Sequence, residues 1–190
     1  RAAGFVGIAG PGELLGTSAL TVNLLGLDRL LAVQNLLSAG QGVEVHINDC
    51  IVNGISDGFT VEAFGGESDV YEYTAAGFIA DSNSTKITNS HTYNLLSVTS
   101  PDEYGYSGGF IGTSETGGLA EVANEDDTSV KRLIEANGLD RAIGYLIPSY
   151  TDCTVHFISG QGHVDGDVAG GFVADMELGT VDNQSRGDGN

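Results

Sequence analysis

The acidic side chains of this sequence offer the ligands that a calcium ion prefers, because Ca²⁺ binds clustered oxygen atoms. Three segments hold such residues close together. They are Asp165-Gly166-Asp167, the segment Asp81-Ser82-Asn83 with Asp175 if copies of a repeat stack, and Asn124-Glu125-Asp126-Asp127. None has the spacing of a known calcium loop such as an EF-hand. Ordinary solvated carboxylates are the alternative, and no cofactor other than Ca²⁺ is expected.

The tripeptide Arg186-Gly187-Asp188 is a second candidate binding site. Integrins recognise this tripeptide when its Arg and Asp lie at opposite ends of a tight loop. It stands near the end of the sequence, where chains are often disordered. A chance occurrence is the alternative interpretation.

The sequence contains few of the residue patterns that are typical of catalytic sites. There is no Gly-x-Ser-x-Gly elbow and no phosphate-binding loop, and the four histidines show no metal-ligand spacing. A glycosidase needs two carboxylates that face each other across the scissile bond, and 26 acidic residues do not by themselves identify such a pair. We therefore predict a non-enzymatic protein, with a β-helical glycan-cleaving hydrolase or lyase as the alternative.

The composition disfavours several classes of partner. Asp and Glu number 26 against 7 Lys and Arg, which gives a formal net charge of −19. Nucleic acids and anionic membrane surfaces attract clustered basic residues, so neither is an expected partner. No segment reaches the ~18 consecutive apolar residues of a membrane span, so membrane insertion is not expected. Two cysteines are too few for a disulfide-dense scaffold.

A five-residue motif that occurs four times predicts the framework on which these residues lie. Each copy consists of a small residue, Gly, Phe, Val or Ile, and a second small residue, and a branched aliphatic follows nine residues after each Phe. Stacked repeats place equivalent residues above one another. We expect one inward column of Phe5, Phe78, Phe110 and Phe172 and another of Leu14, Ile87, Leu119 and Val181. The glycine before each Phe is expected to permit a tight corner with positive φ.

A second pattern alternates with the first. The segment Asn48 to Asn53 resembles Asn89 to Asn94, which places His91 at the position of Cys50. Cys153 occupies the same place in a third copy, so both cysteines are expected to be small, buried residues. Because they would lie several coils apart, we do not expect a disulfide between them.

These patterns predict one all-β domain over residues 1–190, a right-handed parallel β-helix (β-solenoid). The repeat unit is roughly 30 residues long, the size of a solenoid repeat, and the right hand follows from the chirality of parallel crossovers. Two departures from the repeat, Leu14 to Leu37 and Asp126 to Pro148, are expected to carry one or two short helical insertions, the clearer over Thr128 to Asn137. A β-sandwich is the alternative.

The repeat resembles the GLUG-motif β-solenoid repeats of large bacterial surface proteins. In those repeats a Gly-Gly-(Leu/Phe)-Val-Gly segment is followed by a Gly-x-(Ile/Val)-x-Asn-Cys-like segment. The segment Gly170 to Ala174 followed by Gly179 to Asn183 matches this pattern most clearly, and Ala76 to Asn89 matches it next. The resemblance covers roughly half of the chain, and the long insertions depart from it.

This resemblance implies a segment of a longer extracellular protein of the bacterial cell surface, often an adhesin, and it supplies no catalytic residues. We therefore predict an adhesin or stalk module that presents loops for weak, multivalent contacts. Its partner would be a host or cell-surface glycan or protein. A purely structural spacer is a further alternative, against which the insertions argue because they could build a binding surface.

Overall fold

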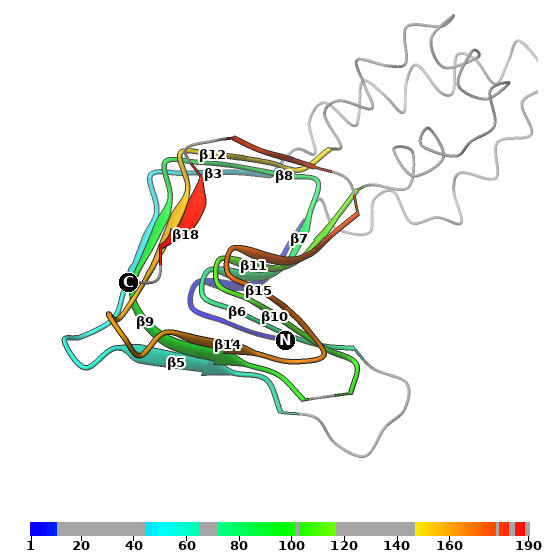
Figure 1. Ribbon diagram of the computed structural model, residues 1–190. Coiled ribbons are helices and arrows are strands. Elements are labelled where there is room, and N and C mark those ends of the chain that lie inside the picture. The colour runs from blue at the N-terminus through cyan, green and yellow to red at the C-terminus, as the bar shows by residue number, and fades with distance from the viewer. Residues whose placement is uncertain are drawn as a thin grey trace, which may run out of the picture.

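The computed structural model describes residues 1–10, 45–64, 72–101, 103–116, 147–177, 179–182 and 185–188. Every regular element among these residues is a β-strand. No helix long and apolar enough to cross a bilayer occurs in this part of the chain. The strands form four sheets, here called A to D, and the chain visits the sheets in the same order four times (Figure 1). We call each of these passages a coil.

The four coils consist of equivalent strands. Coil 1 contains β1 (Ala2–Ala3), β2 (Val6–Ala9), β3 (Val45–Asn48), β4 (Ile51–Asn53) and β5 (Phe59–Glu62). Coil 2 contains β6 (Tyr73–Ala76), β7 (Ile79–Asn83), β8 (Thr85–Thr88) and β9 (His91–Thr99). Coil 3 contains β10 (Gly105–Gly108), β11 (Ile111–Glu115), β12 (Ser149–Thr151), β13 (Thr154–Phe157) and β14 (His163–Asp165). Coil 4 contains β15 (Val168–Gly170), β16 (Val173–Met176), β17 (Thr180–Val181) and β18 (Arg186–Asp188).

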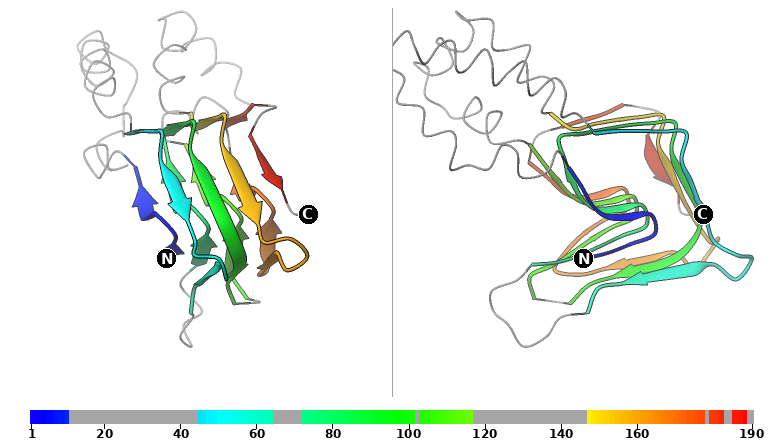
Figure 2. Two further views of the ribbon diagram at one scale, coloured as in Figure 1. Left: turned by 90° about the vertical axis from the view of Figure 1, so that its left-hand side faces the viewer. Right: turned by 180° about the vertical axis from the view of Figure 1, so that it is seen from behind.

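Each sheet takes its strands from successive coils, which lie side by side in Figure 2. Sheet A has the order β1-β6-β10-β15, sheet B β2-β7-β11-β16 and sheet C β3-β8-β12-β17, while sheet D joins β4, β5, β9, β13, β14 and β18. All pairings between these strands are parallel. The predicted all-β, parallel character is confirmed and is consistent with a β-helix or solenoid. The alternative of a β-sandwich, whose sheets are antiparallel, does not fit these pairings. The predicted helices lie outside the described residues.

The four phenylalanines of the repeat form a continuous stack. The ring centroids of Phe78 and Phe110 are 4.5 Å apart, and the rings are within 6° of parallel. Phe5 stacks on Phe78, and Phe172 on Phe110, each at 5.0 Å. Phe78 and Phe110 are fully buried, whereas Phe5 in coil 1 is 47% exposed. The predicted phenylalanine column is therefore present.

The glycine before the Phe in coils 1, 2 and 3 is required by the close approach of the next coil. A Cβ atom on Gly4 would lie 2.2 Å from the carbonyl oxygen of Gly77, and one on Gly77 would lie 2.2 Å from that of Gly109. A Cβ atom on Gly109 would lie 2.1 Å from the carbonyl oxygen of Gly171. None of these four glycines has a positive φ. The predicted left-handed corner is therefore wrong, because the constraint is a steric one between coils.

The second predicted column has different members. Ile87 pairs in sheet C with Ile47 on one side and with Tyr150 on the other, and Val181 follows Tyr150. The column therefore contains Ile87 and Val181 as predicted, but Ile47 and Tyr150 take the other two places. Ile87 and Tyr150 are fully buried, and Val181 in coil 4 is partly exposed.

The other two predicted members, Leu14 and Leu119, lie outside the described residues. They were expected in the column because each stands nine residues after a Phe. That offset does not apply in coils 1 and 3, because residues 11–44 and 117–146 intervene between sheets B and C.

Tyr150 links the inner sides of sheets B and C. Its hydroxyl oxygen lies 2.9 Å from Ser82 Oγ and 2.6 Å from Ser114 Oγ, on neighbouring strands of sheet B. Burial raises the pKa of Tyr150 to about 12. The phenol therefore stays protonated in the folded protein and can donate to one of the two serines.

An aspartate or asparagine turns the corner between sheets C and D in the first three coils. Asp49, Asn89 and Asp152 have φ values of 57°, 45° and 53°. Among residues with a side chain, Asn and Asp adopt this left-handed conformation most readily. The corner explains the recurrence of the second sequence pattern.

The register of this second pattern differs by one residue from the predicted one. Ile51 pairs with His91, so Ser90 rather than His91 lies beside Cys50, whose N–H donates to Ser90 Oγ at 3.2 Å. The predicted equivalence of His91 and Cys50 is wrong, and a shift of one residue exchanges the two faces of a strand. Cys50 and Cys153 are both free. Cys153 is buried as expected, and burial raises the pKa of its thiol to about 11. Cys50 is only half-buried, so the expectation that both are buried is wrong for Cys50.

The phenylalanine stack predicts a gradient of stability effects along the coils. Phe110→Ala should lower the free energy of unfolding by ~3–5 kcal/mol, because it removes a fully buried ring that has a stacked neighbour on each side. Phe5→Ala should cost clearly less, because Phe5 is half-exposed and stacks on one ring. Equilibrium urea unfolding measures both effects, and equal losses would contradict the column as a buried core.

Candidate functional site

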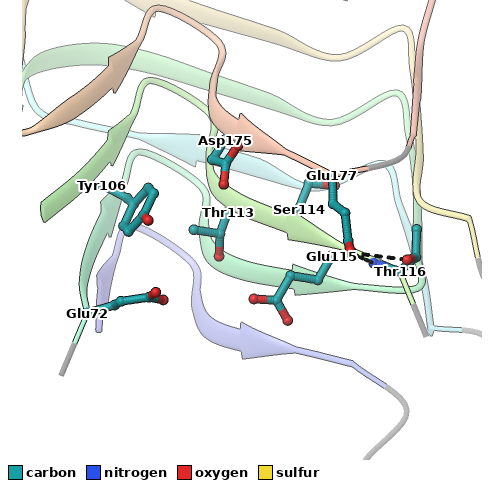
Figure 3. A pocket seen from close by; sticks show the side chains of 8 residues that line it. All are labelled: Glu72, Tyr106, Thr113, Ser114, Glu115, Thr116, Asp175 and Glu177. Atoms are coloured by element: carbon teal, nitrogen blue, oxygen red, sulfur yellow. Dashed lines mark hydrogen bonds between the residues drawn. The ribbon is translucent and has the colours of Figure 1, made fainter. Parts of the chain in front are cut away.

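A groove lined with acidic residues lies between sheets A and B (Figure 3). The chain reverses direction between these sheets at the Gly-Phe bend (Figure 1). The groove has a volume of about 400 Å³ and is lined by Glu72, Tyr106, Thr113, Ser114, Glu115, Thr116, Asp175 and Glu177. Glu72 and Tyr106 come from the side of sheet A, and the others from β11, β16 and the residues that follow these strands.

Asp81, a predicted calcium ligand beside this groove, is already contacted by protein donors. The Arg1 guanidinium contacts its carboxylate, and Thr113 Oγ1 donates to it at 2.9 Å. Asp175 lies in the same column of sheet B, but Thr113 stands between the two acids. Stacking therefore does not make Asp81 and Asp175 direct neighbours. Within the described ranges, no group of three or more His, Cys, Asp or Glu could hold a metal ion.

Glu115 is a groove carboxyl group whose pKa is raised above its usual value. Partial burial is the main cause, and the negative charges of Asp81 and Glu177 add to it, while Arg1 acts in the opposite direction. The pKa of the Tyr106 phenol is raised as well, again by burial first and then by nearby carboxylates. A carboxyl group that keeps its proton to higher pH is the form that a general acid needs.

Glu177 differs from Glu115 in its hydrogen bonds. Its Oε2 atom accepts from Thr116 Oγ1 at 3.2 Å and from the Thr116 N–H at 3.4 Å (Figure 3). The groove therefore combines a carboxyl group that resists ionisation with one that is hydrogen-bonded by its neighbours. Such a pair can bind cationic groups or, with a sugar between them, exchange protons.

The other predicted calcium ligands do not line the groove or lie outside the described residues, although the charge of Asp167 contributes to the raised pKa of Tyr106. Asp165 ends β14, and Asp167 precedes β15. His163 Nε2 lies 3.7 Å from Asp165 Oδ2, and both side chains are exposed. Asp126 and Asp127 lie outside the described residues.

The predicted integrin tripeptide forms strand β18. Arg186, Gly187 and Asp188 pair in parallel register with Thr154, Val155 and His156 of β13. A paired strand is extended, so the expected tight loop with Arg and Asp at its ends is wrong. The sequence did not reveal this because the tripeptide was considered apart from the repeat in which it lies.

Both long insertions leave the sheets at the corner between sheets B and C. Residues 11–44 connect β2 to β3, and residues 117–146 connect β11 to β12. Coil 2 turns the same corner with Ser84 alone, at a φ of 50°. Neither insertion is therefore needed to close its coil, and both begin and end at one edge of the stack, two coils apart.

A cluster of rings on sheet D escaped the sequence analysis. Tyr93 stacks on His156, with centroids 4.9 Å apart and rings within 6° of parallel, and His91 lies 5.8 Å from Tyr93. His91 Nδ1 also lies 2.8 Å from Thr154 Oγ1. These side chains are half-buried, whereas Thr92 between His91 and Tyr93 is fully buried. With the correct register, the alternation along β9 predicts this cluster.

Comparison with protein-family models, with curated proteins and with solved structures gives no match for this chain.

The raised pKa of Glu115 predicts the sign of a pH effect on stability. A carboxyl group with a raised folded-state pKa adds stability at low pH, and this contribution is lost as the pH rises through that pKa. Glu115→Gln keeps the side chain uncharged. We expect this variant to match the wild type in acid and to become more stable than the wild type as the pH rises. Urea unfolding over a range of about pH 3 to 7 measures the difference.

Glu62→Gln on β5 provides the control for this experiment. Glu62 is exposed, and its replacement also removes one negative charge from a chain of net charge −19. Equal stabilisation by the two substitutions would show that general charge repulsion, rather than the groove, causes the effect.

Proposed function

We propose that this chain is a non-enzymatic adhesin or stalk module of a bacterial cell-surface protein, built as a right-handed parallel β-helix of the GLUG-repeat type. The observation that carries the proposal is the shared corner of the two insertions. In a stack where each coil rests on its neighbours, two segments that leave the same corner two coils apart are attached at points of fixed separation. That arrangement suits weak contacts made at several points on one partner.

The proposed partner is a host or cell-surface glycan or protein, met outside the cell. The resemblance of the repeat to bacterial surface proteins supports this location. The formal net charge of −19 favours a neutral or basic partner over a phosphate-rich one. The insertions, rather than the sheets, are proposed to make the contact.

Shortening the insertions tests this proposal. In coil 2, the sequence Asn83-Ser84-Thr85 turns the corner that the insertions occupy in coils 1 and 3. Replacing residues 116–148 by Ser-Thr copies that corner into coil 3, and replacing residues 11–44 by Ser copies it into coil 1. We expect both variants to unfold cooperatively and to lose binding to glycan arrays and surface-protein panels that retain the wild type. Binding that survives both replacements would overturn the proposal.

A glycan-cleaving β-helix is the second candidate, and the groove is the observation that favours it. A glycosidase needs one carboxylic acid that is protonated and one carboxylate, and Glu115 and Glu177 both line the groove. Incubation with a panel of polysaccharides, followed by mass spectrometry, reports new chain ends. We expect none. New chain ends formed by the wild type and not by Glu115→Gln would replace the adhesin proposal by the enzyme, and a wild type that neither binds nor cleaves would leave a structural spacer.

A further inference from the structure

Gly171 lacks the steric constraint that explains the three equivalent glycines. A Cβ atom on Gly4, Gly77 or Gly109 would meet the glycine carbonyl oxygen of the next coil at 2.1 to 2.2 Å. A Cβ atom on Gly171 would meet no described atom within 4 Å, and its φ is not positive. Within the described residues, coil 4 thus carries the glycine that a further coil would require.

We propose that coil 1 of a second copy of this chain stacks on coil 4, head to tail. In this arrangement the Gly4 carbonyl oxygen of the second copy lies beside Gly171, just as the Gly171 carbonyl oxygen lies beside Gly109 within the chain. The ring of Phe5 from the second copy then stacks on Phe172 and continues the phenylalanine column. The half-exposed Phe5 becomes a buried ring with a neighbour on each side.

The edges of the sheets fit this arrangement. Strands β1, β2 and β3 form one edge of sheets A, B and C, and β15, β16 and β17 form the opposite edge. Because all strands are parallel, a copy shifted by one coil along the stack continues each sheet with parallel pairing. The strands of coils 2 and 3 carry no large exposed apolar residue. Coils 1 and 4 carry six on their strands or on the Gly-Phe bend, namely Phe5, Ile8, Ile51, Val168, Met176 and Val181.

The register of the coils also avoids contacts between like charges. Continuing the columns places Asp175 opposite Ile8, and Val168 opposite Arg1, of the second copy. Asp182 falls opposite Asn48 of the second copy. Like charges directly opposite one another on neighbouring strands are destabilising, and this register contains none at these positions.

Sedimentation velocity over a range of protein concentrations tests the proposal on the full chain. We expect the wild type to form species that lengthen with concentration. Added NaCl should strengthen the association, because it screens the repulsion between chains of net charge −19. A wild type that remains monomeric at all concentrations and salt levels would overturn the proposal.

Gly171→Ala separates stacking from folding. The added methyl group has free space in the single chain, so the thermal unfolding midpoint of the isolated chain should not change. In the assembly it would meet the Gly4 carbonyl oxygen of the second copy, so we expect this variant to be monomeric. Gly109→Ala is the matched control and should lower the unfolding midpoint, because its methyl group meets Gly171 within the chain. If Gly171→Ala associates as strongly as the wild type, the proposal is overturned.

A charge pair at Ile8 tests the register. Ile8 is 67% exposed, so substitutions there leave the core in place, but its partner within the chain is Asp81. The thermal unfolding midpoint of each variant as a monomer therefore separates an effect of Asp81 from an effect on association. Ile8→Asp would face Asp175 across the contact and should weaken self-association by at least about tenfold. Ile8→Lys would face the same aspartate with the opposite charge and should associate more tightly than Ile8→Asp. Equal association of the two variants would contradict the proposed register.

Discussion

The close approach of neighbouring coils at the Gly-Phe bend is the constraint on which the rest of the structure depends. A carbonyl oxygen 2.1 to 2.2 Å from the place of a Cβ atom leaves room for a hydrogen atom only. With the coils at this spacing, the phenylalanine rings stack at 4.5 to 5.0 Å, and the buried rings pack into the core cluster that contains Tyr150. The same bend sends the chain from sheet A back along sheet B. The acidic groove between these sheets is therefore a consequence of the glycines.

Sheet B connects the core, the groove and the insertions. On its inner side, Ser82 and Ser114 contact the buried hydroxyl of Tyr150, whereas Thr113 and Glu115 line the groove. This alternation is the ordinary consequence of a strand whose successive side chains point to opposite faces. Beyond the end of sheet B, the chain enters the insertions.

The features that recur locally could be predicted from the sequence, and those that depend on position in the stack could not. The phenylalanine column was predictable because the motif is short and has no gaps. Ile47 and Tyr150 were missed because insertions interrupt the fixed offset from Phe. The register of the second pattern was misplaced because Asn48 and Asp49 are both suited to a left-handed corner, and the pairing of Ile51 with His91 selects Asp49. The groove joins residues far apart in sequence, so no single motif marked it.

The stack distributes its negative charge unevenly, and this adds to burial, the main cause, in raising the pKa of Glu115. In one column of sheet B, Thr113 separates Asp81 from Asp175, so a neutral hydroxyl stands between two acids. In sheet B, Ser114 pairs with Met176. The residues that follow them, Glu115 and Glu177, therefore lie side by side with no neutral residue between them. Thr116 donates to Glu177, whereas Glu115 lies beside the Glu177 charge, which adds to the burial that raises the pKa of Glu115. At neutral pH, a proton or another cation that reaches Glu115 therefore stabilises the folded stack.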